Sequence, residues 1–95
     1  MPVVAVLYDY KVDAESVAIQ DEIRPRHREF LFRQPNLLLT GPTDDSGAVI
    51  VFDGEVAQIE QLMDDDPFAD ADVIARRRVV AWNVVGGSLR EHLPG

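Results

Sequence analysis

The central part of the chain reads Leu37-Leu38-Leu39-Thr40-Gly41-Pro42-Thr43-Asp44-Asp45-Ser46-Gly47-Ala48-Val49-Ile50-Val51-Phe52. Two apolar runs flank a segment that is dense in Gly, Pro, Asp and Ser, which are the residue types that form turns. A strand, a short loop and a second strand in direct succession predict an antiparallel hairpin, over residues 36–40 and 48–52.

The segments on either side of this hairpin each combine a helical pattern with a strand pattern. Residues 3–10 form a continuous apolar, β-branched and aromatic run, typical of a central strand that is covered on both faces. A helical pattern follows over about residues 14–33. After the hairpin, Asp53 is placed to cap a helix over residues 54–63, and residues 78–85 form a last apolar strand.

Pro25 interrupts the first helical pattern. Proline lacks a backbone donor and disfavours helical geometry at the residue before it. Two interpretations stay open: one helix that is kinked at Pro25, or a segment that ends near Glu22 with a new helix whose first turn contains Pro25.

The element order β-α-β-β-α-β predicts an α+β protein. With right-handed crossovers it gives the ferredoxin-like arrangement, a four-stranded antiparallel sheet with two helices on one face, in a single domain over residues 1–95. The other sheet face would then be bare. In a chain this short only a second subunit can cover it, so we expect a homodimer packed sheet against sheet. Trp82, in the last strand, is assigned to the core.

The composition excludes several classes of partner. The chain has 17 acidic and 9 basic side chains, a formal charge of -8, and no cysteine. Such a surface repels phosphate backbones and anionic lipid, so we expect neither nucleic-acid nor membrane binding. No apolar run is long enough to span a bilayer, and the first residues lack the basic start of a signal sequence. We therefore expect a cytoplasmic protein.

His27 is the most informative single residue. The only other histidine, His92, lies in a polar tail. In a helix, Ile23, His27, Phe30 and Leu31 follow the spacing i, i+4, i+7 and i+8, which places them on one face. This puts an ionisable ring on the face that should contact the sheet, where its charged form needs a partner.

Asp66 is the partner that we predict for His27. It closes the run Asp64-Asp65-Asp66 at the end of the second helical pattern, where negative charge is mildly unfavourable and therefore invites a reason. Both helices lie on the same sheet face, so Asp66, held before Pro67, can approach the first helix. A carboxylate there would fix the tautomer of the ring and stabilise its protonated form. An equal alternative is that His27 bonds only a backbone carbonyl in the core.

Further residues are candidates for substrate binding. Arg24 and the backbone groups of Gly41 and Pro42 could hold an anionic substrate such as a carboxylate or phenolate. Tyr8 and Tyr10, at the end of the first strand, could reach a cleft with a hydroxyl, although half-buried strand tyrosines are common. Arg28 is assigned to the solvated surface. The sequence contains no phosphate-binding loop, nucleophile elbow or zinc-ligand spacing, so we expect no cofactor and no metal.

With these residues in view, the sequence resembles the YCII-related, or YciI-like, family over nearly its whole length. The resemblance rests on Arg24-Pro25-x-His27-x-x-Phe30-Leu31, on Gly41-Pro42 before an acidic turn, on Asp66-Pro67-Phe68 and on Trp82. The chain departs from the family pattern at Ala81, where proline is frequent, and at Asp72, where glycine is frequent.

This resemblance implies a ferredoxin-like fold that dimerises as an α/β barrel, related to muconolactone isomerase and to a chlorohydroxyhydroquinone dehydrochlorinase. It also implies a His–Asp pair in a pocket, which corresponds here to His27 and Asp66. We therefore expect a small enzyme of lyase or isomerase type that moves a proton on a small cyclic or aromatic substrate. The alternatives are a non-catalytic dimeric module that binds a small ligand or a protein, and a haem- or quinone-handling oxygenase of the related barrels.

Overall fold

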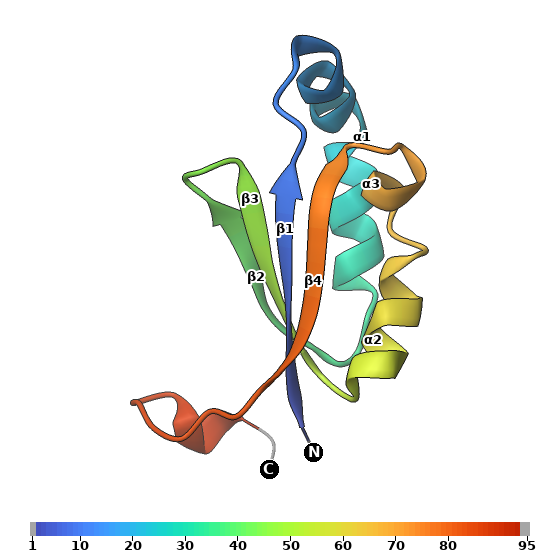
Figure 1. Cartoon of the computed structure of the whole chain (residues 1–95). Helices are drawn as coiled ribbons and strands as arrows, with labels where there is room; N and C mark the ends of the chain where they lie inside the picture. The colour runs from blue at the N-terminus through green and yellow to red at the C-terminus, as the bar shows by residue number, and fades with distance from the viewer. Residues whose placement is uncertain (1, 94–95) are drawn as a thin grey trace.

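A four-stranded sheet with helices on one face makes up the body of the protein (Figure 1). The structure, a computed structural model, describes residues 2–93. Within this range the elements are β1 (Val3–Tyr10), α1 (Ala14–Phe32), β2 (Leu37–Thr43), β3 (Gly47–Asp53), α2 (Val56–Met63), α3 (Pro67–Asp70), β4 (Ile74–Trp82) and a 3-10 turn at Arg90–His92. The strand order is β2-β3-β1-β4, and all neighbours are antiparallel. The ferredoxin-like prediction is confirmed.

The core lies between the sheet and the helices. Successive side chains of a strand point to opposite faces, so alternate residues of β1 and β3 reach this core. Its buried members are Val4, Val6, Tyr8, Leu31, Ala48, Ile50, Phe52, Ile59 and Met63. Because β1 is paired on both sides, it is the central strand that its continuous apolar run predicts.

Helix α1 runs continuously past Pro25, so the interpretation as one kinked helix is confirmed. Its start is capped by Asp13, whose carboxylate accepts a hydrogen bond from the amide of Ser16 at 3.0 Å. The first and last turns of α1 do not follow one straight axis (Figure 1), as expected where a proline removes a backbone hydrogen bond. Beyond the proline, His27 and Leu31 are buried one turn apart.

The second helical segment differs from the prediction at its start. Asp53 does not cap it, because Asp53 is still part of β3 and pairs with Val3. Helix α2 begins later, with Glu55 as its cap and the amide of Glu55 directed at the side chain of Gln58 at 3.4 Å. The cap and its reciprocal partner form a capping box, for which a glutamate in the cap position is a less common residue.

Strand β4 begins and ends earlier than predicted. It pairs with β1 from Ile74 to Trp82, so Val84 and Val85 lie beyond it. Its arginines at positions 76–78 obscured the strand pattern, but β4 is an edge strand, where charged side chains are common. The assignment of Trp82 to the core is wrong: the side chain lies at the end of the sheet and is 47% exposed.

The sheet surface opposite the helices, here called the outer face, has no described helix packed on it. By strand register and alternation, its apolar side chains are those of Val3, Ala5, Leu7, Leu39, Val49, Val51, Val80 and Trp82. Of these, Val3, Ala5 and Val51 are buried, whereas Leu39 and Trp82 are exposed. The C-terminal segment, residues 83–93, leaves the end of β4 and projects away from the body (Figure 1). None of the described helices is both long and apolar enough to cross a membrane.

Candidate active site

The carboxylate of Asp66 lies at the centre of a buried polar cluster. Asp66 is 0% exposed and accepts three hydrogen bonds. Its Oδ1 is 2.8 Å from Nδ1 of His27 and 3.0 Å from the amide nitrogen of Phe68. Its Oδ2 accepts the hydroxyl hydrogen of Tyr8 at 2.7 Å. Because both oxygens are bonded, the carboxylate has one fixed orientation.

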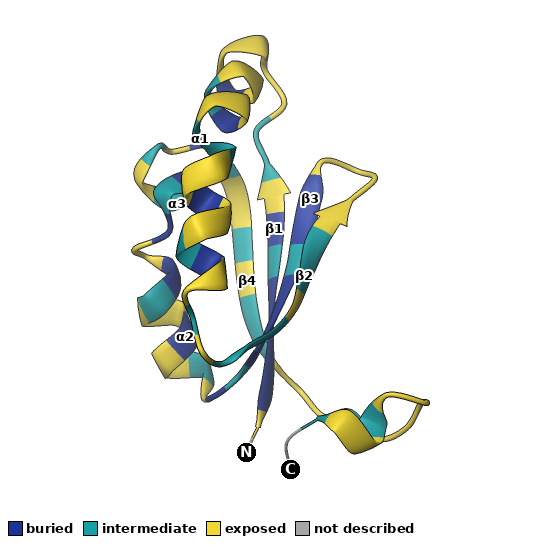
Figure 2. Ribbon diagram, turned by 180° about the vertical axis from the view of Figure 1, so that it is seen from behind, coloured by how far each residue is buried: buried dark blue, intermediate teal, exposed yellow. Residues whose placement is uncertain are grey.

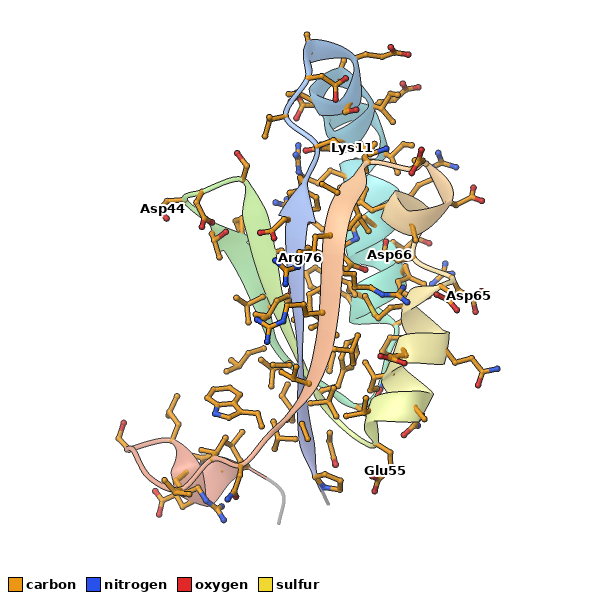
Figure 3. All side chains as sticks on the ribbon, in the orientation of Figure 1. Lys11, Asp44, Glu55, Asp65, Asp66 and Arg76 are labelled. Carbon is orange, nitrogen blue, oxygen red and sulfur yellow. The ribbon has the colours of Figure 1, made fainter. Side chains whose placement is uncertain are left out.

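Local sequence explains why Asp66 points inward. It is the N-cap of α3, with an extended backbone, and Pro67 occupies the first helical position, a favoured combination. Its two acidic neighbours behave differently. Asp64 forms an ion pair with Arg77 at 2.9 Å, and Asp65 is exposed on the outside of the molecule (Figure 3). The charge of Asp66 is therefore at a helix start, where it is favourable, and not only at the end of α2.

His27 presents one ring nitrogen to the cluster and the other to the outside. Nδ1 is bonded to Asp66, and the ring stacks on Phe68 with centroids 4.0 Å apart and an interplanar angle of 11°. Nε2 has no hydrogen-bond partner among residues 2–93. Nε2 is not completely buried, and 8% of the His27 side chain is exposed. The carboxylate at Nδ1 favours the tautomer in which neutral Nε2 carries a lone pair.

A pocket of about 280 Å³ opens beside His27. One wall is α1 and the opposite wall is β2, with β1, β3 and α3 at the base; Figure 2 shows α1 in front of the sheet with β2 and β3 to one side of it. The lining residues are Tyr10, Arg24, His27, Arg28, Leu31, Phe32, Thr40, Gly41, Pro42, Ala48 and Phe68. The pocket is thus lined by one imidazole, two guanidinium groups and several apolar side chains.

The structure brings most of the predicted site residues to this pocket. Arg24, His27, Gly41 and Pro42 line it. Arg24 also forms an ion pair with Asp21 at 2.7 Å. Arg28, which the sequence placed on the solvated surface, is exposed and lines the same pocket.

Tyr8 does not line the pocket. It is 2% exposed and lies behind the dyad, where it contacts Asp66. Tyr10, two residues later and therefore on the same face of β1, takes the place at the pocket wall. Tyr8 is thus in the site without being in reach of a bound molecule.

Both tyrosines remain neutral at physiological pH. Burial, and next the negative charge of Asp66, raise the pKa of Tyr8 well above its ordinary value of 10.0. Burial, followed by the charge of Asp66, raises the pKa of Tyr10 to about 12, with the charge of Arg24 acting in the opposite direction. The two hydroxyls are therefore hydrogen-bond donors and not anions.

Sequence reasoning missed three features of the site: helix α3, the stacking of Phe68 on His27, and the bond from Tyr8 to Asp66. The first has a local signal, because Asp66-Pro67 is a typical helix start. The last joins residues 58 positions apart and has no local signal. Within the described part of the chain, no three His, Cys, Asp or Glu side chains form a group that could hold a metal ion.

Comparisons with known proteins were made by sequence and by structure. No protein-family model matches the chain, and no curated protein matches it. Among solved structures, it is similar to 5-chloro-2-hydroxyhydroquinone dehydrochlorinase (TftG) from Burkholderia phenoliruptrix AC1100, in complex with 2,5-dihydroxybenzoquinone. The TM-score is 0.74 at 16% identity, over 85% of this chain and 93% of that chain.

Two further structures share the fold. A putative monooxygenase from Shewanella loihica PV-4 has a TM-score of 0.56 at 21% identity, over 92% of this chain and 99% of that chain. A putative antibiotic biosynthesis monooxygenase from Nitrosomonas europaea has a TM-score of 0.53 at 18% identity, over 90% and 100%. These similarities establish the fold. At such identities they do not establish a reaction.

Proposed function

We propose that this protein is a small acid–base enzyme of lyase or isomerase type, in which Nε2 of His27 moves a proton on a small cyclic or aromatic substrate. One observation carries the proposal: a fully buried Asp66 holds Nδ1 of His27, and the ring of His27 lines the pocket with 8% of its side chain exposed. In this arrangement Asp66 orients the ring and offsets the positive charge that the ring gains when it accepts a proton. The proton then returns to another substrate atom in an isomerase, or passes to solvent in a lyase.

The pocket fits a small anionic ring. Its volume of about 280 Å³ is near the lower end for ligand pockets, which suits one ring better than an extended molecule. Arg24 and Arg28 flank His27 on α1 and can bind carboxylate or phenolate oxygens. Backbone groups of Gly41 and Pro42 contact the substrate from the β2 wall. To bind fully, Arg24 exchanges its ion pair with exposed Asp21 for the ligand.

The solved neighbour TftG supports this class of chemistry. TftG is a 5-chloro-2-hydroxyhydroquinone dehydrochlorinase, and its structure holds 2,5-dihydroxybenzoquinone. Dehydrochlorination removes a proton and a chloride from the substrate, so it needs a base, and we propose His27 for that role while the chloride leaves to solvent. The proposal takes from this neighbour only the reaction class and the ring-shaped ligand.

Membership of the YCII-related family and assembly as a homodimer are part of the same proposal. The phrase Asp66-Pro67-Phe68 provides a helix cap, a carboxylate and a stacking ring at one place, which gives that family resemblance a physical role. The exposed side chains of Leu39 and Trp82 favour burial of the outer face against a second copy. A mostly apolar hollow of about 420 Å³ between Trp82 and the C-terminal segment extends the same surface. We expect the enzyme to work in the cytoplasm.

A ligand-stabilisation screen tests the proposal. The wild-type protein is heated with small aromatic acids, phenols, lactones and 2,5-dihydroxybenzoquinone, and the compounds that raise Tm are then followed for chemical change. We expect at least one compound to stabilise the protein and to be converted. A ligand that binds in the pocket and is always recovered unchanged would favour the non-catalytic module instead.

A further inference from the structure

Tyr8 is the only residue in the buried cluster to which the proposed reaction gives no role. Its hydroxyl is the donor to Oδ2 of Asp66, at 2.7 Å. The ring is held in the core of the central strand, next to Tyr10 with centroids 5.9 Å apart and to His27 at 6.5 Å. The hydroxyl therefore cannot leave Asp66 without disturbing the sheet.

We infer that Tyr8 is a positioning residue that sets the proton affinity of His27 by sharing the negative charge of Asp66. This inference deepens the proposed function and rests on it for its significance in catalysis. The coupling itself is a property of the folded protein and needs no substrate.

The physical basis is competition between donors for one carboxylate. Asp66 accepts hydrogen bonds from Tyr8, from the amide of Phe68 and from His27. Each donor to a charged acceptor withdraws part of its charge and weakens the attraction left for the others. A weaker hydroxyl bond leaves more negative charge facing His27, which favours the protonated ring. A stronger hydroxyl bond does the reverse.

Tyr8 acts through its dipole and not by passing on a proton. Burial and the adjacent carboxylate raise the pKa of Tyr8, so its hydroxyl keeps its hydrogen throughout the physiological range. The other polar, charged and aromatic groups near the His27 ring and Tyr8 are the same in the two proteins of each comparison. They are Arg24 and Arg28 on α1, Tyr10 on β1, Asp66 and Phe68 at α3, and Arg77, which pairs with Tyr8 in the sheet, with its partner Asp64.

The test is a titration of the His27 ring followed by NMR. The chain has two histidines, so a His92→Gln background leaves His27 as the single signal. In Tyr8→Phe we expect the midpoint of the His27 titration to move upward by about half to one pH unit, which is roughly a three- to tenfold gain in proton affinity. Folding of each variant is checked by circular dichroism before titration.

A second variant changes the strength of the hydroxyl bond and leaves its geometry intact. The chain has two tyrosines, so a Tyr10→Phe protein produced with fluorotyrosine carries the label at position 8 alone. A fluorinated phenol is more acidic and is a stronger donor to Asp66. Relative to unlabelled Tyr10→Phe, we expect the His27 midpoint to move downward by about two to five tenths of a pH unit.

The inference is supported if the His27 midpoint moves upward when the Tyr8 hydroxyl is removed and downward when its hydrogen bond is strengthened, because loss of packing does not produce opposite shifts. The inference is overturned if the His27 midpoint is unchanged in both proteins, or if it moves in the same direction in both. Should Tyr8→Phe fail to fold, the fluorinated protein alone decides by the sign of its shift. If His27 takes no part in catalysis, the proposed reaction is wrong, but the coupling between Tyr8 and His27 can still be measured. Failure of the proposed reaction and failure of this inference are therefore distinguishable.

Discussion

The two faces of the sheet are built from the same strands but differ in how completely one chain covers their side chains. On the helix side, the polar groups of Tyr8, His27 and Asp66 are bonded to one another and surrounded by core. On the outer face, Leu39 and Trp82 leave 55% and 47% of their surface exposed. A single chain thus buries the helix side of the sheet, whereas the outer face keeps exposed apolar side chains.

This difference follows from strand alternation in β1. Val4, Val6 and Tyr8 point to the helices, while Val3, Ala5 and Leu7 point to the outer face. A shift of one residue would exchange the two sets, so the register that buries the polar cluster also puts these apolar side chains on the face without helices. There Val3 and Ala5 are buried, and Leu39 and Trp82 are exposed. The geometry of the polar cluster therefore follows from the packing of one chain, whereas the outer face keeps apolar side chains that this packing leaves exposed.

Replacing Asp66 should have the largest effect on stability. In Asp66→Ala, the donors on Tyr8 and Phe68 lose their acceptor inside the protein, His27 loses its partner and α3 loses its cap. We expect the free energy of unfolding to fall by about 3–5 kcal/mol, measured by urea denaturation. The neighbouring Asp65→Ala is the matched control, since Asp65 is exposed, and should change it by less than about 0.5 kcal/mol. Equal losses in both variants would show that the cluster adds no stability.

Trp82→Glu tests whether the protein self-associates through the outer face. A charge at this exposed position should weaken self-association about 100-fold, or roughly 2.7 kcal/mol, with little change in the fold of the monomer. Analytical ultracentrifugation measures the dissociation constant. Val17→Glu, on α1, is the control, because Val17 is also exposed at 41% but lies on the other side of the molecule. A wild-type protein that stays monomeric at high concentration would contradict the proposed homodimer.

Removing the hydroxyl of Tyr8 should cost less than removing Asp66, because one donor is lost and not the shared acceptor. We expect Tyr8→Phe to lower the free energy of unfolding by about 1–3 kcal/mol at pH 7. The raised pKa of folded Tyr8 stabilises the protein below the unfolded value of about 10, and this stability is lost as the pH rises further. The gap between wild type and Tyr8→Phe should therefore narrow above pH 10 in urea titrations. A gap that widens there would mean that the native hydroxyl ionises early.

Arg24→Gln should have the smallest effect on stability and a selective effect on binding. We expect about five- to tenfold weaker binding of the aromatic acid that stabilises the wild-type protein most, or roughly 1 to 1.4 kcal/mol, measured by isothermal titration calorimetry. Stability should stay within about 0.5 kcal/mol of wild type, because the ion pair with Asp21 is exposed. Arg26→Gln, also on α1 but outside the pocket, is the control. Equal loss in both variants would indicate a general effect of net charge.

The sequence predicted the fold better than the details of the site. The hairpin between residues 37 and 52 and the central run at 3–10 have strong local patterns, and the three strands pair as expected. The contact between His27 and Asp66 also follows from topology, since both helical segments lie on one sheet face. Strand β4 was placed too late because its arginines conceal the pattern, and only pairing with β1 shows where it starts.

The role of Tyr8 could not be derived from the sequence. A strand tyrosine near a cleft and a strand tyrosine behind it have the same local pattern, and Tyr8 differs from Tyr10 only in depth. That depth is set by how α3 places Asp66, 58 positions away in the sequence, against β1. The prediction for Trp82 was wrong for a related reason. An apolar strand residue gives the same sequence pattern whether its side chain points into a core or lies on an exposed face of the sheet.

The central claim concerns a single atom, Nε2 of His27, and His27→Asn tests it most directly. The amide nitrogen of asparagine can replace Nδ1 as the donor to Asp66, while Nε2 is removed. On the substrate found by screening, we predict that kcat falls about 10² to 10⁴-fold while the protein stays folded and still binds the ligand. A folded His27→Asn protein that turns over this substrate at the wild-type rate would contradict the account.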